Sequence, residues 1–186
     1  MHHRTVFAEA DPIPAVRLTL AFDRQIGRRQ QLGGISRHFA ELAQGLRASG
    51  AVDVAPPDRR GRRRAAIVHA TYYSSWPYRL RPGQALVSSH HDMTPERHPE
   101  LFPLGQLRSP HGRKAEWFAA SDLILSNSAA SADDLTFFWP QIQRPIRVIH
   151  LATGLDRVIP EPVPALEGRR FWLLVGKRVP YKNVLT

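Results

Sequence analysis

The sequence predicts an α/β fold, a parallel β-sheet flanked by helices, and three observations support this class. Short apolar segments of strand-forming residues alternate along the chain with segments whose apolar residues recur at helical spacing. Two of the apolar segments, Ala65–Ala70 and Gln84–Ser89, have the short continuous runs of strands that are buried on both faces. The 186 residues are 42% hydrophobic and 23% charged, which is typical of a globular domain with a sizeable core.

The first part of the chain is expected to hold a lead-in, a strand and a helix. Residues 1–15 contain two prolines and no periodicity, so we expect a disordered lead-in. Val16–Phe22 alternates and is rich in strand formers, which predicts the first strand. A helix of about 15 residues follows and ends near Gly50. Its apolar face comprises Ile35, Phe39, Leu42, Ala43 and Leu46.

The remaining elements continue the alternation of strands and helices. Further strands are predicted at Val52–Ala55, Ala65–Ala70, Gln84–Ser89, Asp122–Asn127 and Ile146–Leu151. Helices are predicted at Arg113–Ala120 and Ser128–Phe138, and Ser128 or Ser131 is suited to cap the second. The segment His90–Pro110 contains four prolines, which indicates a long loop.

The chain is expected to contain one complete domain and the beginning of another. Residues 16–151 form the α/β domain, and the proline-rich residues 152–169 form a linker. The apolar run Phe171–Val175 then predicts the first strand of a second domain. Residues 170–186 contain only this strand and the turn after it, so the second domain is expected to be truncated.

The charge, the cysteine content and the lack of long apolar runs limit the kinds of site and the cellular location that we expect for the protein. The net charge is +10, and all but three of the 26 basic residues are arginine. Cysteine is absent, which excludes disulfides, thiolate metal sites and cysteine nucleophiles. No apolar run approaches the ~18 residues that span a bilayer, and no signal peptide is evident. We therefore expect a cytoplasmic protein, with peripheral association at the inner face of an anionic membrane as an alternative setting.

Five arginines crowd into residues 59–64 around Gly61. A solvated loop is the simplest interpretation, since runs of one charge usually lie on exposed faces. Binding of phosphates or anionic lipid headgroups is the alternative. The run has no interleaved aromatic residues and no regular motif, so no specific nucleic-acid partner is expected.

Open parallel sheets bind ligands beyond the carboxyl ends of their strands, so the residues that directly follow strands are the candidate site. Gly33 and Gly34 precede the first long helix, where backbone amides and the helix dipole favour a diphosphate; a simple turn is the alternative. Arg178 and Lys182 follow the last predicted strand. Four residues apart on a helix, they would converge on one phosphate, with solvated surface charges as the alternative.

His90, His91 and Asp92 follow the strand that ends at Ser89. An imidazole here is suited to donate to a sugar hydroxyl or to carry a proton, and a structural histidine is the alternative. Adjacent residues of an extended segment point in opposite directions, so the two histidines make poor co-ligands and no metal is expected.

Tyr72 and Tyr73 follow the strand at 65–70, with Trp76 and Tyr78 close behind. Aromatic side chains with polar tips at a strand end are suited to line a carbohydrate site. Capping of the hydrophobic core is the alternative for at least two of the four.

Taken in order along the chain, six segments resemble the GT-B glycosyltransferases, specifically the family-four retaining group, which uses nucleotide-sugar donors. These segments are Gln31–Leu46, Val68–Tyr73, Val87–Phe102, Ala119–Leu135, Ile146–Leu151 and Leu174–Asn183. The resemblance covers residues 16–186. It implies the N-terminal half of an architecture in which two Rossmann-like domains face each other across a cleft.

The resemblance implies transfer of a hexose, with retention at the anomeric carbon, from a nucleotide-diphosphate sugar to a saccharide or lipid-linked acceptor. It places Gly33 and Gly34 against the donor diphosphate and His91, as the catalytic residue, against the transferred sugar. It places Arg178 and Lys182 on the leaving diphosphate, in the role that a divalent metal has in other transferases. The acceptor-side candidates are Tyr72, Tyr73 and Asp92.

The same resemblance implies a long C-terminal donor-binding domain and no metal or other cofactor. We therefore expect a glycosyltransferase of polysaccharide biosynthesis, or a fragment of one whose activity needs the other wall of the cleft. Two alternatives stay open. The chain is a non-catalytic basic binding module, or it is an acceptor-binding domain that acts with a partner chain.

Overall fold

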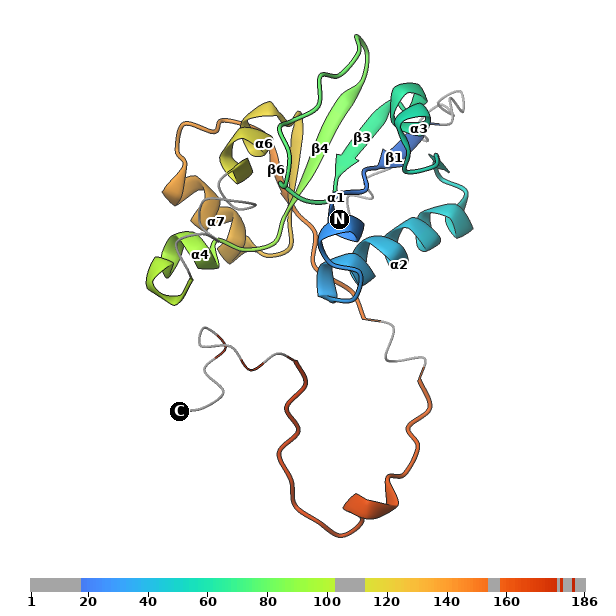
Figure 1. The fold of residues 1–186 in the computed structure, drawn as a ribbon, viewed down its shortest axis with the longest axis vertical. Coiled ribbons are helices and arrows are strands. Elements are labelled where there is room, and N and C mark those ends of the chain that lie inside the picture. Colours follow the sequence, from blue (N-terminus) through green and yellow to red (C-terminus); the bar gives the residue numbers. More distant parts are fainter. Residues whose placement is uncertain (1–17, 103–112, 154–157, 177, 179–181, 183–186) are drawn as a thin grey trace, which may run out of the picture.

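The computed structural model describes residues 18–102, 113–153, 158–176, 178 and 182. In this part of the chain six strands, all parallel, form one sheet at the centre of the domain (Figure 1). The strands are β1 (Thr19–Phe22), β2 (Asp53–Val54), β3 (Ile67–Ala70), β4 (Ala85–His90), β5 (Leu123–Ser126) and β6 (Ile146–Val148). Their order is β2-β1-β3-β4-β5-β6. The predicted α/β class, a Rossmann-like arrangement, is confirmed.

Helices flank the sheet on both faces (Figure 1). Those in the described ranges are α1 (Gln25–Arg29), α2 (Gly34–Ser49), α3 (Arg59–Arg64), α4 (Thr94–Arg97), α6 (Lys114–Ala120) and α7 (Ala129–Phe138). Two 3₁₀ turns, η1 and η4, cover Pro99–Leu101 and Pro164–Leu166. Among these helices there is none both long and apolar enough to cross a bilayer.

Alternation along the strands assigns each side chain to one face of the sheet. Val68 and Leu86 are register partners in β3 and β4, and they pack into one buried cluster with Trp117 of α6. His69 follows Val68 and points to the other face, where its ring contacts Phe39 of α2 at 5.3 Å between centroids. Burial on both faces explains why these strands are apolar without simple alternation.

The ends of the two longest helices have identifiable causes. α2 ends at Gly50, whose φ of 65° is a left-handed conformation that glycine adopts at little cost. Ser128 caps α7, because its Oγ accepts a hydrogen bond from the backbone amide of Ser131 at 3.1 Å. The predicted helix end at Gly50 and the predicted cap at Ser128 are both confirmed.

The arginine run forms a helix, α3, so the expectation of a loop is wrong. Asp58 caps it by accepting a hydrogen bond from the amide of Gly61 at 2.7 Å. Gly61 is buried, and a Cβ added there would lie 1.9 Å from the carbonyl oxygen of Pro56. The glycine that interrupts the run therefore lets the helix pack directly on the chain before it.

The predicted strand Phe171–Val175 is not formed within the described residues. A strand is stabilised by hydrogen bonds to a neighbour, and none of the described strands pairs with this segment. Its large side chains are exposed, Trp172 completely. Residues 158–176 run below the sheet as irregular chain except at η4 (Figure 1). Residues 1–15 and 154–157 lie outside the described ranges, and the division into two domains stays a prediction.

Candidate functional site

A polar residue follows each of four neighbouring strands at the carboxyl edge of the sheet. Asp23 follows β1, Thr71 follows β3, His91 follows β4 and Asn127 follows β5. The chain passes from β1 outward to β2 and then returns to β3 on the other side of β1. The crevice between β1 and β3 is therefore the point where the strand order reverses, which is where open parallel sheets bind ligands.

The amino end of α2 lies at this edge, where the Gln30 side chain lies against Gly33 and Gly34 is exposed. Gly33 precedes the helix in an extended conformation, and no side chain caps the first amides. Gly34 is exposed, and a Cβ placed on it would meet no atom within 4 Å. Uncapped amides at the start of a 16-residue helix favour an anion through their hydrogen bonds and the helix dipole.

His91 packs against the first turns of α2. Its ring stands edge-on to the rings of His38 and Phe39, with centroids 6.1 and 6.3 Å apart. Its backbone carbonyl accepts a hydrogen bond from Ser131 Oγ at 3.0 Å, which ties the residue to α7. The Nε2 atom is buried and makes no hydrogen bond with a described residue. One nitrogen of a well-held ring is therefore left for a ligand.

The imidazole of His91 is neutral at neutral pH. Burial, with smaller contributions from the neighbouring His38 and Lys114, lowers its pKa to about 4, although the Asp92 carboxylate opposes the shift. A neutral imidazole has one N–H donor and one acceptor nitrogen. The ring is therefore suited to exchange a hydrogen bond with a hydroxyl group rather than to pair with a phosphate.

His90 and His91 point to opposite faces of the sheet, as the extended backbone predicts. His90 has no exposed surface, and its ring packs edge-on against Phe118 with centroids 5.2 Å apart. Its Nδ1 lies 3.4 Å from Ser126 Oγ. The two rings therefore pack against different neighbours, although both residues line the same cavity at the carboxyl edge of the sheet. In the described parts of the chain there is no group of three side chains placed to hold a metal ion.

A cavity of about 500 Å³ lies beside His91, between α2 and the carboxyl ends of β3 to β6. Leu42 and Leu46 line it from the helix, and Leu125 and Ile149 line it from the sheet. Five of the nine histidines in the sequence also line it: His38, His69, His90, His91 and His150. An apolar cavity with several imidazoles suits an amphipathic ligand that carries hydroxyl groups.

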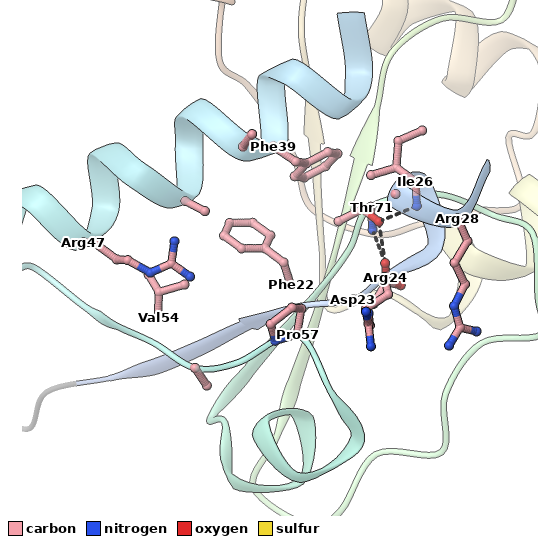
Figure 2. A pocket seen from close by; sticks show the side chains of 14 residues that line it. Phe22, Asp23, Arg24, Ile26, Arg28, Phe39, Arg47, Val54, Pro57 and Thr71 are labelled. Atoms are coloured by element: carbon pink, nitrogen blue, oxygen red, sulfur yellow. Dashed lines mark hydrogen bonds between the residues drawn. The ribbon is translucent and has the colours of Figure 1, made fainter. Parts of the chain in front are cut away.

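A second cavity, of about 360 Å³, lies on the other flank of α2, between this helix, α1 and the carboxyl ends of β1 and β2 (Figure 2). Phe22 and Phe39 form part of its apolar wall. Three arginines line it, with Arg47 at the opposite end from Arg24 and Arg28 (Figure 2). Arg47 belongs to the last turn of α2, so the positive charge of this cavity lies along the middle and the carboxyl end of the helix and not at its start.

Asp23 joins two loops at this edge, and the sequence analysis missed it. The carboxylate is 4% exposed. Its Oδ1 accepts from the Thr71 amide at 3.1 Å, from the Thr71 hydroxyl at 2.5 Å and from the Gln25 amide at 3.1 Å. Its Oδ2 accepts from Gln25 Nε2 at 2.7 Å and from the Tyr78 hydroxyl at 3.2 Å. An aspartate directly after a buried strand is the available signal, because a buried carboxylate needs such partners.

An ion pair holds the loop that carries His91. Lys114 of α6 is 2% exposed, and its Nζ lies 2.9 Å from Glu96 and donates to the Asp92 carbonyl at 3.0 Å. The Asp92 carboxylate accepts a hydrogen bond from the Thr94 amide at 2.9 Å. Burial raises the pKa of Asp92, but the hydrogen bonds from Thr94 and the charge of Lys114 outweigh this and hold the pKa below its usual value. Asp92 therefore shapes the loop of His91.

The two acceptor-side tyrosines have different surroundings. Tyr73 is 4% exposed, and its hydroxyl donates to the Ser89 carbonyl at 2.7 Å. It belongs to the core, which is the alternative that the sequence left open, and its role as an acceptor-side residue stays a prediction. Tyr72 is half-buried and stacks on Tyr73 with ring centroids 5.1 Å apart. Of the pair, Tyr72 alone keeps a substantial accessible surface.

Arg178 and Lys182 lie on the exposed segment after the sheet. Gly176 precedes them with a φ of 132°, which favours glycine, and a Cβ on it would lie 3.8 Å from Lys182 Nζ. The side-chain nitrogen of Lys182 therefore lies close to Gly176. Gly33 and Gly34 stand at the edge of the sheet as expected, whereas the two basic residues stand outside it. Convergence of the two pairs on one diphosphate stays a prediction.

Comparison with known proteins identifies no relative, so a functional assignment has to rest on the geometry of the site. No family model, no curated protein and no solved structure matches the chain. The fold and the site define a Rossmann-like α/β domain. At the carboxyl edge of its sheet are an uncapped helix start, a neutral histidine and two cavities.

Proposed function

We propose that the chain is the acceptor-side part of a retaining hexosyltransferase that uses a nucleotide-diphosphate sugar. The observation that carries the proposal is the buried, unpartnered Nε2 of His91 beside the first turns of a helix whose amino end is uncapped. One feature supplies a hydrogen bond for a sugar, and the other supplies a positive end for a diphosphate. The resemblance of six ordered segments to family-four GT-B enzymes supports the same assignment.

In the proposed reaction, the bond between the anomeric carbon and the diphosphate oxygen breaks. The acceptor oxygen bonds to that carbon on the same face of the sugar, and the acceptor proton passes to the departing nucleoside diphosphate. The first amides of α2, from Gly34 on, together with Arg178 and Lys182, stabilise the charge that develops on the diphosphate. The neutral His91 hydrogen-bonds the hexose and holds it in place.

The cavity of about 500 Å³ beside His91 is the proposed acceptor site. A saccharide presents apolar ring faces and hydroxyl groups, and a lipid-linked acceptor adds apolar chain. The leucines of α2 and the imidazoles along the strand ends match both kinds of surface. In this proposal the acceptor lies on one side of His91 and the diphosphate lies at the start of α2.

A second candidate is an acceptor-binding domain whose donor site is completed by a partner chain. The exposed apolar run Phe171–Val175 favours it, because such a run is stabilised when it pairs with a strand of another domain. Both candidates use His91 and the acceptor cavity. Transfer of labelled hexose that depends on an added partner chain selects the second.

Titration with uridine- or guanosine-diphosphate sugar, followed by NMR chemical shifts, tests the shared part of the proposal. We expect weak binding, in about the millimolar range, because residues outside the described sheet complete the donor wall. The Gly34 amide and the His91 ring should shift with the same concentration dependence. His91→Ala should weaken binding several-fold, whereas the control His98→Ala, on an exposed loop, should not. Saturation with no response at Gly34 or His91 would refute the proposal.

A further inference from the structure

A third cavity of the sheet domain is lined by several arginines that the proposed function does not use. It has a volume of about 330 Å³ and lies between α3 and the segment leading to β4. Five arginines line it: Arg59, Arg62, Arg63, Arg79 and Arg81. Its other lining residues are Val68, Tyr78, Leu80 and Gln84, so no carboxylate faces the arginines. Within the described ranges none of the five guanidinium groups forms an ion pair.

This arginine cavity is separate from the site at His91. Val68 lines the arginine cavity, and the next residue, His69, lines the cavity beside His91. Adjacent residues of a strand point to opposite faces. The two cavities have no lining residue in common, so the arginines are not an extension of the proposed acceptor site.

Gln84 joins the two walls of the arginine cavity. Its Nε2 donates to the carbonyls of Arg62 and Ala65 at 2.7 and 2.6 Å, at the carboxyl end of α3. Its Oε1 accepts from the backbone amide of Arg81 at 2.9 Å. The Asp58 cap and the buried Gly61 hold the other end of the helix. The backbone that carries the arginines is therefore fixed before any ligand arrives.

One guanidinium group is itself held in position. Arg62 is half-buried, and its guanidinium carbon lies 4.6 Å from the centroid of the Tyr78 ring, a cation–π contact. The Tyr78 hydroxyl donates to Asp23 at 3.2 Å, which fixes the ring. The other four arginines are exposed and reach into the cavity from its two walls.

We propose that the arginine cavity binds a phosphoryl anion, either a soluble diphosphate group or the phosphate of a lipid headgroup. Five like charges around one cavity repel each other, and a multiply charged anion relieves that repulsion. Planar guanidinium groups match pairs of phosphate oxygens. The volume is that of a small-ligand site.

Calorimetric titration of the full chain with inorganic pyrophosphate tests the proposal. Arg59→Gln/Arg63→Gln removes two charges from the cavity, and Arg60→Gln/Arg64→Gln removes two from the same helix outside the cavity lining. We expect the first pair to lose about tenfold or more in affinity and the second to lose less than about threefold. Equal losses, or unchanged binding by the first pair, would overturn the proposal. If the first pair fails to fold, Arg79→Gln/Arg81→Gln on the loop wall replaces it with the same expected loss.

Two further titrations place the ligand. Pyrophosphate binding should persist in Arg178→Gln/Lys182→Gln; its complete loss there would assign the heat to the proposed donor site and overturn the arginine cavity while leaving the proposed function intact. Vesicles of phosphatidylglycerol in phosphatidylcholine then identify the source. Sedimentation that pyrophosphate competes away, and that the Arg59/Arg63 pair abolishes, indicates a lipid headgroup. Pyrophosphate binding without sedimentation indicates a soluble ligand.

Discussion

Replacement of Asp23 by alanine should strongly destabilise the fold, because five hydrogen bonds end on its buried carboxylate. The change leaves the donors of Thr71, Gln25 and Tyr78 without an acceptor. Each buried donor left unpaired costs about 1–3 kcal/mol, and those nearest the edge of the sheet recover water. We expect the free energy of unfolding to fall by about 4 kcal/mol.

Asp23→Asn separates the loss of acceptors from the loss of volume. The amide keeps the shape of the side chain but turns one acceptor into a donor that faces other donors, so we expect a loss of about 2 kcal/mol.

Urea unfolding followed by tryptophan fluorescence measures both effects. Asp133→Asn, at an exposed position of α7, is the control and should change stability by less than about 0.5 kcal/mol. A loss below about 1 kcal/mol for Asp23→Ala would refute the reasoning, because the carboxylate would then not join the two loops.

Two substitutions and one change of conditions test the packing elsewhere. Gly61→Ala should cost about 3 kcal/mol because its Cβ meets a backbone oxygen. Gly45→Ala, with open space around it, should stabilise α2 by about 0.5–1 kcal/mol. Thermal unfolding in which both variants shift the stability in the same direction would contradict the packing of α3. Lys114→Ala should cost about 3 kcal/mol in urea unfolding by leaving Glu96 unpaired, and Lys114→Met, which also removes the charge but fills the space, should cost less; a loss below about 1 kcal/mol for both would show that the ion pair is dispensable. Burial lowers the pKa of His69 to about 3 and that of His90 to about 4. The unfolded chain takes up protons first, so stability is complete above about pH 6.5 and falls toward about pH 4 by about 1 kcal/mol per pH unit for each ring; a urea midpoint that stays constant across this range would exclude neutral buried imidazoles.

The strands of the sheet and its two longest helices were predictable because their signals are local. The apolar run at 65–70 contains β3, and the run at 84–89 contains all of β4 except its last residue, His90; the helical spacing that starts at Ile35 identifies α2. Each signal depends on neighbours within a few residues, such as a cap, a left-handed glycine or an apolar face.

The arginine run and the last apolar run were mispredicted for the same physical reason. α3 exists because Gly61 packs on Pro56, a contact that charge patterning does not reveal. The run Phe171–Val175 has the composition of a strand, but a strand forms only when another strand supplies its hydrogen bonds. In both cases the deciding partner is a particular segment brought close by folding.

The features of the candidate site also divide into those that the sequence predicts and those that depend on contacts between distant segments. The position of His91 after a strand indicated its place at the edge of the sheet. Its unpartnered nitrogen, the carboxylate network of Asp23 and the burial of Lys114 depend on atoms from several segments. Tyr73 has the same sequence signal as Tyr72, and only packing separates the core residue from the accessible one.

The sequence by itself determined the parallel α/β class, the helix ends at Gly50 and Ser128, and the opposite directions of His90 and His91, because backbone geometry and short-range hydrogen bonds set all of these. The tertiary structure decided which polar groups are left unsatisfied, which arginines share a cavity and which apolar run stays unpaired. Those properties depend on many contacts between segments that are distant in the sequence, and these contacts form only when the chain folds.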